Sequence, residues 1–191
     1  MLKSRIAPAP RPTAAYSADH KVTLAPLACP YCAHKIRAAD AEMHDNVVRL
    51  VFGGSEERFD EFVRVVREDI PEGTRVVLRG SAITGHRWKD GLPFDAEGPG
   101  TSDLDLTLVG DEVIGLFTVT GFFVPGLHSR PLSDDDPGIA PPLVALRETL
   151  MALTGRPVNI QASRDVVIQF RGDLLGQPYL LLIDRAEKPA A

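Results

Sequence analysis

Two aspartates, Asp103 and Asp105, stand two residues apart in a stretch where polar and apolar residues alternate as far as Val109. This alternation predicts a β-strand with one buried face, so both carboxylates are expected to leave the strand on the same side. Carboxylates held that close repel each other unless a positive charge lies between them. A hard divalent cation that prefers oxygen ligands, Mg²⁺ or Mn²⁺, supplies that charge. Asp103 and Asp105 are therefore the candidate metal ligands and catalytic residues.

A second candidate feature, Gly80-Ser81, ends the apolar run that begins at Arg75. Glycine lets a backbone approach a phosphate without a Cβ in the way, and serine offers a hydroxyl. Backbone N–H groups beyond it would point at phosphate oxygens if a helix starts there. The pair therefore predicts a phosphate contact. The structural alternative is that Gly-Ser is an ordinary turn and that the two aspartates are a solvated strand face.

The order of these motifs, Gly80-Ser81 after one strand and Ser-Asp-Leu-Asp at 102–105 on the next, resembles the nucleotidyltransferase superfamily, which has the fold of the polymerase beta palm. The resemblance implies that Gly80, Ser81 and Ser102 contact the nucleotide and that Asp103 and Asp105 bind catalytic Mg²⁺. It also implies transfer of a nucleoside monophosphate from a nucleoside triphosphate, with ATP as the expected donor, to a hydroxyl-bearing acceptor, with release of pyrophosphate. The acceptor stays open between a small molecule, a protein side chain and a tRNA end.

The sequence departs from the family pattern in two places. The connection between the motifs is long, and its segment 86–101 is rich in glycine, proline and charge, which predicts a loop that overhangs the site. The position of the family's third carboxylate falls on Asn159, which cannot act as a general base near neutral pH. Either the substrate or Asp165 then takes the proton, or the protein is a catalytically inactive nucleotide-binding or protein-interaction module on the same fold.

The elements that must position these residues follow from periodicity. A helix is expected from Ser55 to Ile70, where apolar residues recur every three or four positions, and another from Pro141 or Pro142 to Leu153. A third strand leads to Ile160. Segments 165–170 and 178–184 are predicted as a helix and a strand or as two strands. The long segment 118–138 is predicted as a loop, with His128 a candidate acid or base, Arg130 a candidate phosphate contact, and both more typical of a solvated loop.

Both cysteines of the chain lie in Cys29-Pro-Tyr-Cys32. This spacing resembles a zinc knuckle, in which two further ligands would come from histidines, with three in range: His20, His34 and His44. A redox pair is a second interpretation, and a structural turn with inert thiols is the one that we favour.

Composition bounds the class of protein. The chain has 191 residues, of which 44% are hydrophobic and 25% charged, with a net charge of −5. These values predict a globular protein without general nucleic-acid binding, and no apolar run is long enough to span a membrane, so a cytoplasmic location is expected. We predict an α/β (α+β) fold, a small mixed β-sheet with helices packed on one face. The expected organisation is a disordered lead at 1–15, an N-terminal appendage at 16–54, the nucleotidyltransferase-like domain at 55–185 and a tail at 186–191.

Overall fold

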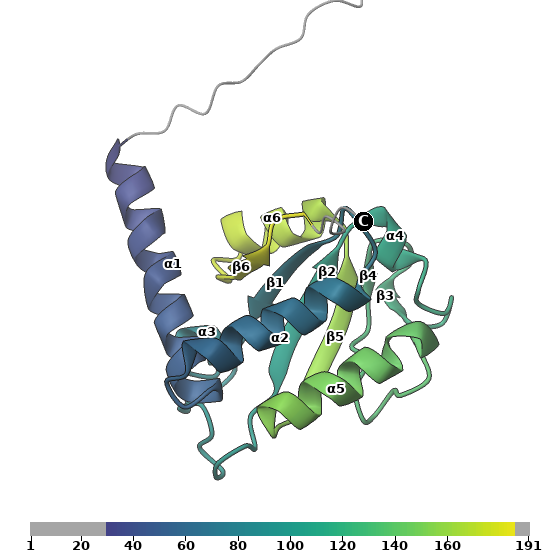
Figure 1. Ribbon diagram of the computed structural model, residues 1–191. Helices are drawn as coiled ribbons and strands as arrows, with labels where there is room; N and C mark the ends of the chain where they lie inside the picture. The colour runs from purple at the N-terminus through teal and green to yellow at the C-terminus, as the bar shows by residue number, and fades with distance from the viewer. Residues whose placement is uncertain (1–29, 186–191) are drawn as a thin grey trace, which may run out of the picture.

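The computed structural model of the protein describes residues 30–185, with side chains from Ala39 onward. Within that range the chain forms six α-helices, one 3-10 helix and an open six-stranded mixed sheet (Figure 1). The helices are α1 (Pro30–Val51), α2 (Glu56–Asp69), α3 (Ser81–Thr84), α4 (Asp111–Ile114), η1 (Pro141–Leu143), α5 (Val144–Thr154) and α6 (Asp165–Asp173). The strands are β1 (Arg75–Arg79), β2 (Leu104–Val109), β3 (Phe122–Val124), β4 (His128–Ser129), β5 (Val158–Ser163) and β6 (Leu180–Ile183). The lead at 1–15 and the tail at 186–191 lie outside the described residues.

The sheet has the strand order β3-β4-β5-β2-β1-β6. Strand β2 lies at its centre, antiparallel to β1 and parallel to β5. The long connection through α5 is what makes the parallel neighbour possible, whereas β3 and β4 form a short antiparallel hairpin. The predicted mixed α/β class is confirmed. Among the described residues, no helix is both long enough and apolar enough to cross a membrane.

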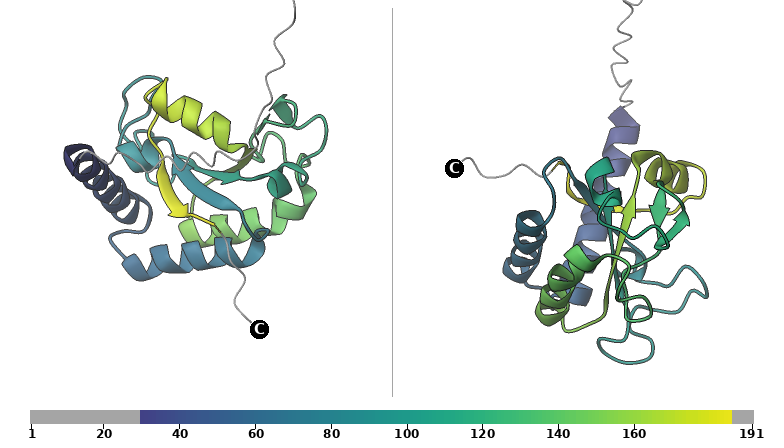
Figure 2. Two further views of the ribbon diagram at one scale, coloured as in Figure 1. Left: turned by 90° about the horizontal axis from the view of Figure 1, so that it is seen from above. Right: turned by 90° about the vertical axis from the view of Figure 1, so that its right-hand side faces the viewer.

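Side chains of the sheet alternate between two differently covered faces. Leu78, Leu106 and Ile160 are fully buried in the main core, beneath α2 and α5. On the opposite face Val77 packs against Ile168 of α6. Figure 2 shows α6 on one side of the sheet and α2 and α5 on the other. The expectation that helices pack on one face only is therefore wrong: α6 lies on the face that also carries the polar residues of β2 and β5.

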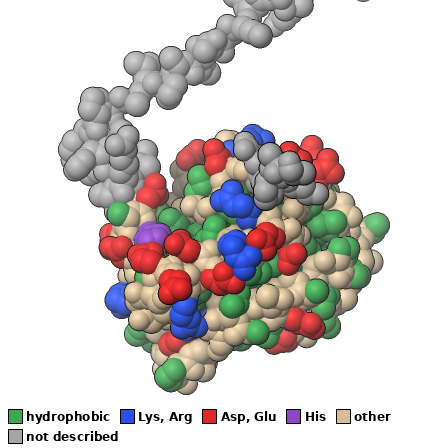
Figure 3. Space-filling model, viewed as in Figure 1, with side chains coloured by type: hydrophobic (Ala, Val, Ile, Leu, Met, Phe, Trp, Pro, Cys, Tyr) green, Lys and Arg blue, Asp and Glu red, His purple; other side chains and the backbone are tan. Residues whose placement is uncertain are grey.

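The helices that periodicity predicts are confirmed. Ser55 caps α2, because its Oγ accepts a hydrogen bond from the Arg58 backbone N–H at 3.3 Å. Gly155 ends α5 in the left-handed conformation. On the solvent side of α2, Arg64 lies between Glu61 and Glu68, and Figure 3 shows acidic and basic side chains interspersed on this face of the molecule. The mixed charge keeps this side polar above the apolar core.

Helices α1 and α4 and strands β3 and β4 are absent from the sequence-based prediction. Helix α1 occupies most of the expected N-terminal appendage and buries Val47, Val48 and Val51 in the main core. Strands β3 and β4 lie inside the segment 118–138 that we predicted as a loop. Strand β4 joins the sheet through one pairing, His128 opposite Ser163. Strand β4 has two residues, so it shows no clear period in the sequence. In α1 Met43, Val47 and Val51 do recur every four positions, a signal that the prediction did not use.

Candidate functional site

Gly80 and Asp105 meet where β1 ends beside the start of β2. The antiparallel register pairs Arg79 with Asp105, so the glycine that follows lies against the Asp105 carboxylate. A Cβ built on Gly80 would lie 2.6 Å from Asp105 Oδ2, and the residue has φ 80° and ψ −160°. Only glycine fits both that contact and that backbone conformation. The sequence therefore uses Gly80 to bring the turn before α3 directly onto a carboxylate.

The two aspartates share one partner. Asn159 pairs with Asp105 in the parallel register of β2 and β5. Its amide nitrogen donates to Asp103 Oδ2 at 2.9 Å and to Asp105 Oδ1 at 3.2 Å. Both carboxylates thus leave β2 on the same side, as the alternating pattern predicts. Asn159 also stands beside them, where the third position was expected from the resemblance.

Asp105 is the more buried of the two carboxylates. Burial raises the pKa of Asp105, and the Asp103 carboxylate raises it further. The hydrogen bond from Asn159 and the positive charges of Arg79 and Arg171 oppose this rise without cancelling it. The ionised form of Asp105 is therefore held at a cost that an additional positive charge would relieve.

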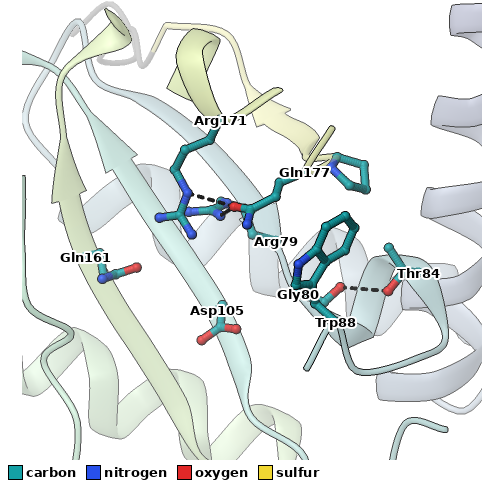
Figure 4. A pocket seen from close by; sticks show the side chains of 9 residues that line it. Arg79, Gly80, Thr84, Trp88, Asp105, Gln161, Arg171 and Gln177 are labelled. Carbon is teal, nitrogen blue, oxygen red and sulfur yellow. Dashed lines mark hydrogen bonds between the residues drawn. The ribbon is translucent and has the colours of Figure 1, made fainter. Parts of the chain in front are cut away.

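Two cavities open on either side of Asp105. The first, which we call the Ser81 cavity, has a volume of about 320 Å³ and includes Ser81, Ser102 and Asp103 in its lining. The second, the Arg171 cavity, has a volume of about 270 Å³. Figure 4 shows this second cavity, which is lined by Arg79, Gly80, Thr84, Trp88, Asp105, Gln161, Arg171, Gln177 and Pro178. Gly80, Trp88 and Asp105 line both, so the carboxylate is reachable from two directions.

The loop at 86–101 lines the Ser81 cavity, as expected of a segment that overhangs the site. Arg87, Lys89 and Trp88 come from it. Arg87 is paired with Glu97 at 3.0 Å. Lys89 lines the same cavity, and within the described residues it has no ion-pair partner within 4 Å.

Asp95 holds the far end of this loop and has the one positive φ (57°) among the described non-glycine residues. Its backbone N–H donates to Ser102 Oγ at 2.8 Å, and its Oδ1 accepts from the Ser102 N–H at 2.9 Å. Arg156, 8% exposed, donates to both Asp95 oxygens and stacks on Phe94 at 4.6 Å. The Ser102 hydroxyl, predicted to contact nucleotide, thus lines the Ser81 cavity while it accepts a bond from the loop.

Asparagine at position 95 is expected to destabilise the fold at neutral pH by about 1–2 kcal/mol, because the buried Arg156 loses its anionic partner. Burial raises the pKa of Asp95, but hydrogen bonds from Gly100, Ser102 and Arg156 outweigh it, so the pKa is lowered overall. Because the pKa is lower in the folded state, the ionised carboxylate stabilises the fold at pH values above the pKa of the unfolded state. This stabilisation is lost as the pH falls through the pKa of the folded state. Urea unfolding of wild type and Asp95→Asn should therefore show a difference in unfolding free energy at pH 7, and this difference should narrow below about pH 4. A difference independent of pH would contradict this account.

Several other residues singled out in the sequence lie away from the aspartates. Asp165 accepts from Arg75 at 2.8 Å, and Arg75 begins β1 at the end opposite Gly80, so the suggestion that Asp165 takes the proton is wrong. Arg130 is paired with Asp136 in its own loop rather than directed to a phosphate. His128 lies behind Arg171, whose guanidinium is 3.2 Å from its Nε2. Burial, then the charges of Arg171 and Arg79, lower the pKa of His128 to about 4, so it is neutral at physiological pH.

The cysteine motif cannot be placed. Cys29 and His20 lie outside the described residues, and Cys32 and His34 fall in the first turns of α1, where side chains are not described. His44 lies 3.5 Å from Glu56 and packs edge-on against Phe59. The zinc-knuckle, redox and inert-turn interpretations all stay open.

Comparisons with known proteins identify no relative. No family model, no curated protein and no solved structure matches this chain.

The donor set around Asp103 fits a hard cation. It consists of two carboxylates and the Asn159 side chain, whose carbonyl oxygen is also a ligand when the amide turns over. Magnesium binds through one or two carboxylates plus waters and substrate phosphates rather than through a closed protein cage. In the described part of the chain, no three His, Cys, Asp or Glu side chains are grouped so that they could hold a metal ion, so this donor set has two carboxylates and no third.

Sequence reasoning missed the cationic half of the site. Arg79, Arg171 and Gln177 come from β1, from α6 and from the segment after it, and they meet on the far side of Asp105 (Figure 4). Arg79 directly precedes Gly80 and stands two positions after Val77, so the two side chains lie on the same face of the strand. This spacing was the signal in the sequence that could have placed Arg79 near the site. Nothing in the local sequence marks Arg171 or Gln177.

Proposed function

We propose that this protein is a metal-dependent nucleotidyltransferase. It would transfer a nucleoside monophosphate from a nucleoside triphosphate, ATP being the expected donor, to a hydroxyl-bearing acceptor, and would release pyrophosphate. The observation that supports this most is that Asp103 and Asp105 line the same cavity as Gly80 and Ser81, while Asn159 donates to both carboxylates. This is the arrangement that the resemblance to the nucleotidyltransferase superfamily implies.

In this proposal the Ser81 cavity holds the triphosphate. The exposed edge of Gly80 lets phosphate oxygens approach the backbone, and the Ser81 hydroxyl donates to them. Lys89 of the overhanging loop adds positive charge to the lining, whereas Arg87 is already paired with Glu97. Asp103 and Asp105 would hold Mg²⁺, which when bound supplies charge stabilisation at the phosphate undergoing transfer. Binding it requires the Asn159 amide to give up its two hydrogen bonds or to turn its oxygen inward.

The transfer step balances without a protein base. The acceptor oxygen forms a bond to the α-phosphorus, the bond from that phosphorus to the bridging oxygen breaks, and pyrophosphate leaves with the electron pair. Asn159 cannot take the acceptor's proton, so the proton passes to solvent. Phosphoryl-type transfer depends chiefly on positioning and electrostatics, so such a site can still accelerate the reaction.

One observation favours a second candidate, a nucleotide-binding module without turnover. The Asn159 amide already satisfies both carboxylates, where the family places a third carboxylate. A protein that retains the nucleotide cavity but not the third charge would bind a triphosphate and leave it intact. Magnesium-dependent binding with no pyrophosphate release for any acceptor class would favour this candidate.

Isothermal titration with each of the four ribonucleoside triphosphates, with and without Mg²⁺, tests the proposal. Wild type should bind at least one of them in a Mg²⁺-dependent manner, and Asp103→Asn should weaken that binding about tenfold or more, because one metal-ligand charge is gone. The matched control is Asp60→Asn, which removes the same charge from the exposed side of α2. Binding that ignores Mg²⁺, or that Asp103→Asn leaves intact, would overturn the proposal.

A further inference from the structure

Two guanidinium groups meet in the Arg171 cavity without a carboxylate between them. Arg79 donates to Gln177 Oε1 at 3.0 Å, and Arg171 Nε donates to the same oxygen at 2.8 Å (Figure 4). Among the described residues neither arginine forms an ion pair within 4 Å. One neutral amide oxygen is therefore what joins two positive charges.

This arrangement is costly for the folded protein. Arg79 is only 9% exposed, and burial together with Arg171 lowers the pKa of Arg79 to about 10, which still leaves it cationic at neutral pH. Burial also lowers the pKa of Arg171. The imidazole behind Arg171 is neutral and offers no compensation. The Asp105 carboxylate opposes the lowering of both pKa values, so one anionic group faces two cations. An excess of positive charge in a partly buried site marks a place where a ligand supplies the opposite charge.

Asp105 is the one carboxylate in the lining of this cavity, and it belongs equally to the Ser81 cavity. Under the proposed function its charge is committed to the metal and the triphosphate. Each guanidinium carries five donors, of which the described residues use one at Arg79 and two at Arg171. The remaining donors match the oxygens of a dianion.

We propose that the Arg171 cavity is the acceptor subsite and that the acceptor carries a phosphate group, which Arg79 and Arg171 bind. Assigning the ligand of this cavity as the acceptor rests on the proposed function. The acceptor and the nucleotide then lie on opposite sides of Asp105. The Trp88 ring, shared by both cavities, forms an apolar wall for the body of the molecule. The Gln161 side chain lies on the wall formed by β5 (Figure 4).

Titration with inorganic phosphate in EDTA isolates this subsite, because without a divalent cation the aspartates repel the anion. Trp88 is the single tryptophan of the chain, so its fluorescence reports on the cavity directly. Wild type should bind phosphate, and Arg171→Gln should weaken it about tenfold or more, since a charge-assisted bidentate contact is lost. Arg171→Lys, which keeps the charge, should recover part of the affinity. Arg67→Gln, an equal charge change on the exposed side of α2, should match wild type.

A second arm separates the two possible sources of the phosphate. If the acceptor supplies it, Arg171→Gln leaves the affinity for Mg²⁺–ATP within about twofold of wild type. An equal loss of phosphate and Mg²⁺–ATP affinity would assign the arginines to the tail of the nucleotide and overturn the acceptor subsite. Acetate binding as tightly as phosphate would also overturn it, in favour of a carboxylate ligand.

The subsite and the proposed function fail separately. Wild type that binds Mg²⁺–ATP but not phosphate overturns the subsite and leaves the transferase intact. Wild type that binds phosphate through Arg171 but no triphosphate supports the anion site and overturns nucleotidyl transfer.

Discussion

Asparagine in place of Asp105 is expected to lower metal-dependent nucleotidyl transfer on the order of 10³-fold while leaving the protein at least as stable as wild type at neutral pH. The loss of activity follows because one of two carboxylates that would hold the metal becomes neutral, and electrostatic stabilisation of the transferred phosphate falls with it. The stability follows from burial. Asparagine has nearly the shape of a protonated aspartate and carries no charge to desolvate.

The pH dependence of that stability has a definite sign. Because the pKa of Asp105 is raised in the folded state, the folded chain binds its proton more tightly than the unfolded chain does. Wild type therefore loses stability as the pH rises above the pKa of an aspartate in the unfolded chain, about 4. The loss stops once the pH has passed the pKa of Asp105 in the folded state. The asparagine variant has no such titration. The gain in unfolding free energy of Asp105→Asn over wild type should be absent at pH 3.5. It should grow as the pH rises through the acidic range and then reach a plateau.

Urea unfolding at pH 3.5, 5, 6 and 7 measures this difference, and pyrophosphate release measures activity. Asp103→Asn is the comparison, because Asp103 is exposed and its loss should lower activity with little change in stability. A variant at position 105 that is less stable than wild type at pH 7 would show that attraction from Arg79 and Arg171 outweighs burial. Full activity in that variant would remove Asp105 from the catalytic site.

Local sequence predicted the half of the site that lies on one hairpin-like pair of strands. Alternation from Asp103 to Val109 specified which side chains share a face, and the break at Gly80 marked where β1 ends. The antiparallel register then brings Gly80 to Asp105 with no further information. Asn159 lies beside the two aspartates, because β5 follows α5 and pairs with β2 in parallel.

Long-range packing supplied the rest, and no local pattern carries it. Arg171 reaches the site because Ile168, one turn earlier in α6, packs on Val77 and so turns the helix over the polar face of the sheet. The same docking puts Asp165, at the start of α6, beside Arg75 at the wrong end of β1 for catalysis. Knowing α6 as a helix would not have shown which face of the sheet it covers. The direction of a helix across a sheet is set by its tertiary contacts.

Alanine in place of Gly80 is expected to lower both stability and activity, and more than any other single methyl group added to the chain's glycines. The backbone conformation at φ 80° and ψ −160° is one that residues with a Cβ rarely adopt, at a cost of about 1–3 kcal/mol. The added Cβ would also lie 2.6 Å from Asp105 Oδ2, so the carboxylate must move. A displacement of about 1 Å at a reacting group costs on the order of 10²-fold in rate.

Gly53→Ala separates the two effects at Gly80. Gly53 has φ 66°, also in the left-handed region, but a Cβ there meets no atom within 4 Å. Its replacement should cost about 1 kcal/mol of unfolding free energy and leave Mg²⁺-dependent triphosphate binding unchanged. The excess loss in Gly80→Ala then measures the contact with Asp105 together with the rarer backbone conformation of Gly80. If both variants lose the same stability and neither loses activity, the close approach of Gly80 to Asp105 has no role in the site, and the turn before α3 serves the fold only.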